Sequence, residues 1–133
     1  MTTKQIIALL ATKLDLTGSF TSVVDASDWP RAEKQTPQAI VGFSRDDNTG
    51  NRSRLISNET YEVIVVTNKA NESEDIWELT DLVRDTIHGK DWGNVDIDAF
   101  QWESRSQIDA DPGTIAYSLM FSVINKLHIP TLS

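Results

Sequence analysis

The 133-residue chain contains no cysteine. This absence excludes disulfide bonds, thiol nucleophiles and thiolate metal sites, and it favours a reducing compartment such as the cytosol. No stretch approaches the roughly eighteen apolar residues that cross a bilayer, and no basic region precedes an apolar run at the N-terminus. We therefore expect no membrane partner and no export signal.

Positive charge is in deficit, with 12 Lys and Arg residues against 20 Asp and Glu residues and a net charge of −8. Such a surface repels phosphate backbones on average, so we expect no specific nucleic-acid binding. An acidic surface would nevertheless suit a channel through which DNA slides without adhering.

Residues typical of catalytic and cofactor sites are scarce. The two histidines, His88 and His128, are far apart in the sequence, and nothing in the pattern brings them together at a metal. Phosphate-binding glycine loops, G-x-S-x-G elbows and H-E-x-x-H motifs are all absent from the sequence. The sequence therefore predicts no enzyme, no cofactor and no bound metal.

Two D-x-D pairs, Asp96 with Asp98 and Asp109 with Asp111, are the remaining candidates for metal-based chemistry. Turns favour Asp for local hydrogen bonding, and this reading outweighs a cation site. The enzymatic alternative is a metal-dependent hydrolase that uses Asp96, Asp98 and Glu103.

The first predicted helix covers residues 4–16. Thr2 and Gln5 have the spacing of a capping box, and apolar residues then recur at helical intervals until Gly18. The stripe consists of Ile6, Ile7, Leu10 and Leu14.

The second predicted helix begins after Asn71, which we interpret as its N-cap, and ends before Gly89. Acidic residues gather near its start, and Arg84 and His88 lie near its end, as the helix dipole favours. Its buried stripe is predicted to be Ile76, Leu79, Val83 and Ile87.

Five apolar or alternating runs predict strands. They are residues 20–24, 39–43, 60–67, 100–108 and 114–124. The 60–67 strand is apolar on both sides, so we expect it to be central and covered on both faces. In the 100–108 strand, Phe100, Trp102 and Ile108 should share one face, and Gln101, Glu103, Arg105 and Gln107 the other.

The resulting order is α-β-β-β-α-β-β in one domain spanning residues 1–133. We predict an α+β fold with a mostly antiparallel or mixed sheet of four to five strands and two packed helices. The turn at 109–113 should close a hairpin, and the crossover through the second helix is where a parallel pair could arise.

A polar segment at about 44–58 is too long for a tight hairpin turn, so we expect it to project as an arm. It contains Arg45, Asp46, Asp47, Arg52 and Arg54, which have charges of both signs. One interpretation is a solvated hairpin tip. The other is a salt-bridge arm that reaches a neighbouring subunit.

Four tryptophans supply large amphipathic side chains of the kind that serve cores or interfaces. Trp102 should lie on the inner face of its strand. Trp77, off the main stripe of the second helix, and Trp29 and Trp92, in loops, are each candidates for a subunit contact or for the edge of the core.

The arrangement resembles the small tail terminator and tail completion proteins of long-tailed phages, the group that includes those of phages lambda and Mu. The likeness lies in the opening helix, the 37–43 strand, the 45–54 arm, the 61–66 strand, the second helix with Ile87-His88-Gly89, and the hairpin ending at 116–123. It covers nearly the whole chain as a pattern of elements.

The resemblance implies a structural virion protein that forms a hexameric ring on the phage tail. The ring would dock on the tail-tube protein, stop its polymerisation and present the surface that joins a head-completion or connector protein. It implies no active site. The subunit-interface candidates are Arg45, Asp46, Asp47, Arg52, Arg54, Trp77 and Trp92. Another tail, neck or baseplate component of similar fold is the alternative within assembly proteins.

Overall fold

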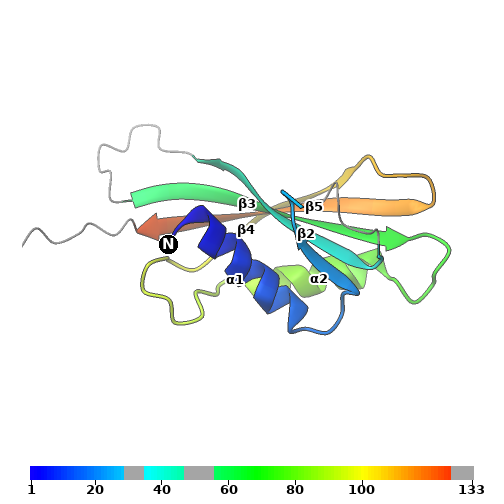
Figure 1. Ribbon diagram of the computed structural model, residues 1–133, viewed down its shortest axis with the longest axis horizontal. Helices are drawn as coiled ribbons and strands as arrows, with labels where there is room; N and C mark the ends of the chain where they lie inside the picture. Colours follow the sequence, from blue (N-terminus) through cyan, green and yellow to red (C-terminus); the bar gives the residue numbers. More distant parts are fainter. Residues whose placement is uncertain (29–34, 47–55, 127–133) are drawn as a thin grey trace, which may run out of the picture.

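A computed structural model describes residues 1–28, 35–46 and 56–126, and Figure 1 shows two helices packed against one face of a twisted sheet. The elements are α1 (Thr3–Asp15), β1 (Ser22–Asp25), β2 (Gln38–Asp46), β3 (Ile56–Asn68), α2 (Ile76–Ile87), β4 (Gln101–Ile108) and β5 (Thr114–Lys126). The predicted α+β class and the order of the elements are confirmed. Trp29 and His128 lie outside the described residues, and neither described helix is long and apolar enough to cross a membrane.

The sheet has five strands in the order β1-β2-β3-β5-β4. β1 and β2 are parallel, and every other neighbouring pair is antiparallel. The crossover through α2 joins β3 to β4, but these strands are separated by β5 and do not pair. The parallel pair therefore does not arise at α2, where the sequence allowed it, and the hairpin of β4 and β5 is confirmed.

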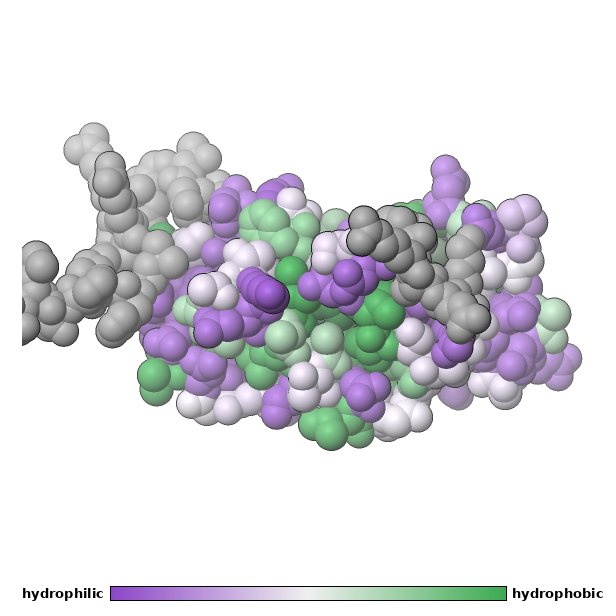
Figure 2. Space-filling view, viewed as in Figure 1, coloured by the Kyte–Doolittle hydropathy of each residue, from purple (hydrophilic) through white to green (hydrophobic). Residues whose placement is uncertain are grey.

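Helix α1 begins as the sequence predicts. The side chain of Thr2 accepts a hydrogen bond from the Gln5 amide, and the Gln5 side chain accepts one from the Thr2 amide. Ile6, Leu10 and Leu14 are fully buried. Figure 2 shows apolar residues gathered in the middle of the side that carries α1, with hydrophilic residues toward both ends.

Helix α2 begins four residues later than predicted, because its N-cap is Asp75 and not Asn71. The Asp75 side chain accepts hydrogen bonds from the amides of Trp77 and Glu78. The Asn71 side chain instead accepts from the amide and hydroxyl of Ser73, which forms a local turn. Both residues suit a cap, so composition alone did not distinguish them.

The core lies between the helices and one face of the sheet, which we call the inner face. β3 contributes Tyr61, Val63 and Val65, all with no exposed area. β5 contributes the register partners of these residues, including Leu119 and Phe121, which are equally buried. The expectation that β3 is covered on both sides is wrong in one respect: among the described elements, no helix covers its other face.

Strand β4 carries a register shift between Trp102 and Ser104 that the sequence reading missed. One extra residue reverses the side to which every later side chain points. Trp102 faces the core as predicted, with its ring 5.6 Å from that of Phe121. Arg105, expected on the solvent face, is instead paired with Leu119 and bonded to α2, and Ile108 moves to the opposite face beside Ala116.

Part of the segment predicted to project as an arm belongs to the sheet. β2 continues through Asp46 after an irregularity between Phe43 and Arg45, and β3 already begins at Ile56. Arg45 is therefore opposite Thr60, in the sheet and not in a loop. The remaining arm, residues 47–55, lies outside the described residues.

Candidate assembly surface

The predicted interface residues fall at separate places on the fold. Arg45 and Asp46 are exposed at the far end of β2, and Trp77 is on α2. Asp47, Arg52 and Arg54 lie outside the described residues. Arg45 is the register partner of Thr60, and Tyr117, which Trp77 contacts, is the register partner of Val65. Thr60 and Val65 are five residues apart on β3, which corresponds to about 17 Å. The structure therefore presents two distinct surfaces.

The first surface is centred on Trp77, whose side chain is 52% exposed. Its ring centroid lies 5.1 Å from that of Tyr117, and the Arg105 guanidinium lies 5.4 Å from the Trp77 ring centroid. A nitrogen of Arg105 donates to Thr80 Oγ1 at 2.9 Å and to Asp81 Oδ1 at 2.7 Å. These contacts fix a half-exposed aromatic ring in place, which lowers the entropy lost when a partner covers it.

Acidic and basic side chains extend this surface along α2. Arg84 lies 3.4 Å from Asp81 and 3.0 Å from Asp85. The hydrogen bond that Arg84 donates to the Asp85 carboxylate raises the pKa of Arg84, which is charged at any physiological pH. Exposed pairs of this kind contribute little to stability, so their value lies in the charge pattern they present.

Trp92 occupies the edge of the core. Its ring is 5.9 Å from that of Phe100, and the ammonium of Lys13 lies 5.6 Å from the Trp92 ring centroid. Trp92 has a positive φ of 50° and is half-buried. Of the two positions that the sequence allowed for this residue, the structure places it at the core edge.

The second face of the sheet, which we call the open face, carries no described helix. It pairs Ile40 with Ile64, Val66 with Ala116, and Met120 with Glu62.

Ile64, Val66 and Met120 are partly exposed, and Ile124 on the same face is 40% exposed. Ser118 donates to Glu62 and places a polar pair among them. A mixed apolar and polar sheet surface of this kind suits contact with another protein.

A buried polar network ties the first residue to the sheet. Glu59 is 6% exposed and accepts a 2.8 Å hydrogen bond from the Tyr61 hydroxyl and a longer one from Asn125. Asn125 in turn donates to the carbonyl of Met1 and accepts from its amino group. Burial, followed by the hydrogen bond to Glu59 and its charge, raises the pKa of Tyr61 well above its usual value.

The described residues offer no group of three His, Cys, Asp or Glu side chains that could hold a metal. Asp98 pairs with Lys126 at 2.9 Å, and Glu103 accepts a hydrogen bond from Ser122. His88 lies at the end of α2, where its Nδ1 accepts from the Trp102 amide at 3.0 Å. The carboxylates of the hydrolase alternative are therefore not assembled into a site.

No family model matches the chain, and no curated protein matches it. The fold is similar to that of a chain in the virion of a native gene transfer agent (GTA) particle. The two share 15% sequence identity at a TM-score of 0.54, over 90% of this chain and 85% of the other. The likeness establishes a common fold.

Proposed function

We propose that the protein is a non-enzymatic structural subunit of a phage-like virion, assembled in the host cytoplasm, and that it acts there as the tail terminator. The observation that carries the proposal is the shared fold with a virion chain, which extends over 90% of this protein. The alignment leaves little of either chain outside the common domain, so nearly all of this chain has a fold that is used in a particle.

The surfaces of the domain support this role. A terminator ring, which we propose to be hexameric, needs two different complementary patches on each subunit, because cyclic contacts are head-to-tail. The open face, which includes Arg45 opposite Thr60, is separate from the Trp77 surface on α2 and differs from it chemically. These two surfaces provide patches for the neighbouring copies, for the tail-tube protein and for a head-completion or connector protein.

The charge of the chain is consistent with a ring through which DNA passes. The net charge of −8 repels a phosphate backbone on average. DNA is therefore proposed as a passing molecule and not as a ligand.

Deletion of the gene in its phage or prophage tests the proposal. Electron microscopy of the resulting lysate should show tails of uncontrolled length without heads. Tails of normal length that fail to join heads would assign the protein to the neck and overturn the terminator role. Complete particles of normal appearance would overturn the structural role altogether.

A further inference from the structure

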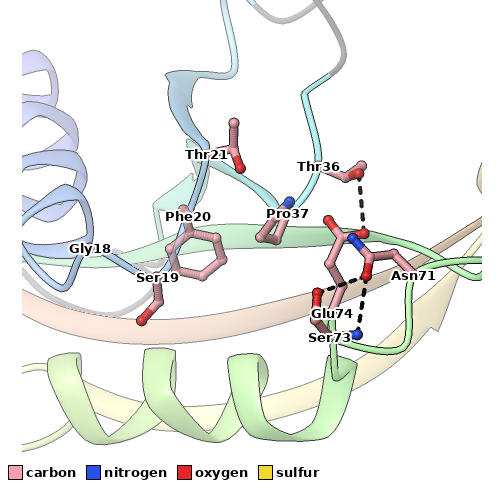
Figure 3. Close-up of a pocket in the computed structure, with 9 residues that line it drawn as sticks. All are labelled: Gly18, Ser19, Phe20, Thr21, Thr36, Pro37, Asn71, Ser73 and Glu74. Carbon is pink, nitrogen blue, oxygen red and sulfur yellow. Dashed lines mark hydrogen bonds between the residues drawn. The ribbon is translucent and has the colours of Figure 1, made fainter.

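A hollow of about 510 Å³ lies where the connection from α1 to β1, the start of β2 and the 71–74 turn meet (Figure 3). Hydroxyl groups of Ser19, Thr21, Thr36 and Ser73 belong to its lining residues. The described lining contains one carboxylate, that of Glu74, and no Lys or Arg. We call this hollow the Glu74 pocket. With a carboxylate and no cationic side chain, this lining suits a positively charged hydrogen-bond donor.

The Glu74 carboxylate is only half satisfied. Its Oε2 accepts from the Asn68 amide at 3.2 Å and from the Thr36 hydroxyl at 3.4 Å. Its Oε1 is buried and receives no hydrogen bond from the described part of the chain. Figure 3 shows the carboxylate turned from the 71–74 turn toward Thr36 and Pro37. A buried carboxylate oxygen without a donor is costly, so this oxygen marks a position for one more donor.

The pocket favours a guanidinium over an anion or a metal ion. Asp75 already occupies the free amides at the start of α2, so those donors are not available to an anion. A divalent cation takes about six or more oxygen ligands, usually with several carboxylates, and only one is present here. A guanidinium carries one charge and a fork of donors that matches a carboxylate. The buried Phe20 ring in the pocket wall offers a surface for its plane.

The chain itself provides a donor for such a contact. Arg84 and Arg105 are both paired with Asp81, whereas exposed Arg45 has no ion pair among the described residues. Arg45 lies near one end of β2, and Pro37 of the pocket directly precedes the other end, about 26 Å away along the strand. Opposite ends of one strand cannot meet within a subunit, but a head-to-tail arrangement of copies brings two different patches of the chain into contact.

We propose that the Glu74 pocket receives the Arg45 side chain of a second copy of this chain. The inference rests on the proposed function, which requires a repeated head-to-tail contact. The two experiments below can nevertheless disprove the pocket proposal and the proposed function independently of each other.

The first experiment titrates the isolated full-length protein with N-acetyl-argininamide and follows backbone amide resonances by NMR. Saturable shifts are expected at Ser19, Thr21 and Ser73, and the neutral citrulline analogue should produce none. Glu74→Gln keeps the acceptor geometry but removes the charge, and it should weaken binding at least tenfold. Glu72→Gln, which removes the same charge outside the pocket lining, should leave it unchanged. Absence of binding, or equal binding to Glu74→Gln, would overturn the pocket whatever the gene deletion shows.

The second experiment uses the absence of native cysteine. Particles that carry both Arg45→Cys and Ser73→Cys should form a ladder of covalent multimers on mild oxidation. Particles with either single substitution should give no ladder. Fully monomeric protein from oxidised double-variant particles would overturn Arg45 as the donor. If argininamide binds but the gene deletion leaves normal particles, the proposed function fails and the pocket stands.

Discussion

The two faces of the sheet differ in what they contribute. The inner face is mainly apolar and covered by both helices, and most of its side chains on β3 and β5 have almost no exposed area, with Ile115 and Tyr117 partly exposed. The open face has alternating apolar and polar side chains, several of them partly exposed. The comparison indicates that the inner face provides most of the folding free energy, whereas Ile64, Val66, Met120 and Ile124 on the open face keep apolar area that the described residues leave exposed.

Adjacent residues of β5 give the largest test of this comparison. Leu119 is fully buried on the inner face, and Met120 of similar size is partly exposed on the open face. Leu119→Ala should lower the free energy of unfolding by about 2–5 kcal/mol, since it leaves a cavity in the core. Met120→Ala should cost only about 1 kcal/mol, because part of that side chain is already in water. Urea denaturation measures both, and equal losses would contradict the comparison.

Close packing around Gly42 of β2 gives the next largest effect. A Cβ at this position would lie 2.8 Å from the Cβ of Ala26, which is closer than two non-bonded carbon atoms approach each other. Gly42→Ala should therefore destabilise the fold by about 1–3 kcal/mol through overpacking. The double variant with Ala26→Gly removes the opposing methyl group and should recover most of the loss in the same denaturation experiment. Failure to recover would mean that Gly42 matters for another reason.

Alkaline pH tests the buried network at the end of the inner face. An unfolded tyrosine loses its proton near pH 10, whereas burial holds the Tyr61 proton to higher pH. Above about pH 10 the native state therefore binds more protons than the unfolded state. The stabilisation is fully present below about pH 10, and the free energy of unfolding falls as the pH rises beyond it. Unfolding free energies at about pH 9 and about pH 11 should show this fall. Tyr61→Phe should reduce it, and Tyr117→Phe, which changes the only other tyrosine, serves as the control.

Trp77 should give the smallest effect on stability. The residue is 52% exposed and its ring contacts Tyr117 and Arg105 at the surface, so Trp77→Ala should change the free energy of unfolding by about 1 kcal/mol or less. The same variant should reduce the number of particles with correctly joined heads and tails, counted by electron microscopy. Normal particle counts would remove Trp77 from the assembly surface.

The sequence predicts the elements of this fold better than their boundaries. The cap of α1 was predictable because both partners, Thr2 and Gln5, belong to one local motif. The cap of α2 was not, because Asn71 and Asp75 suit the same role and only the course of the turn decides between them. The register of β5 with β3 is unbroken from Thr114 to Lys126, so the side chains of β5 alternate between the two faces along the whole strand.

The candidate surfaces were harder to predict, for a physical reason. The bulge in β4 depends on pairing with β5, and no local signal shows where alternation reverses, so Arg105 was assigned to the wrong face. The two apolar sides of β3 look equally suited to burial in sequence, although only one receives helices. The Glu74 pocket unites segments more than fifty residues apart in the chain and depends on the tertiary fold.

Site-specific labelling measures most directly whether the open face is an assembly surface. The cysteine-free chain allows a single thiol at Ile124→Cys on the open face, with Thr12→Cys on the exposed side of α1 as the control. In the free protein, a maleimide should label both thiols. In intact particles, the account predicts that the thiol at position 124 is protected and that the thiol at position 12 stays reactive. Equal labelling of position 124 in free protein and in particles would contradict it.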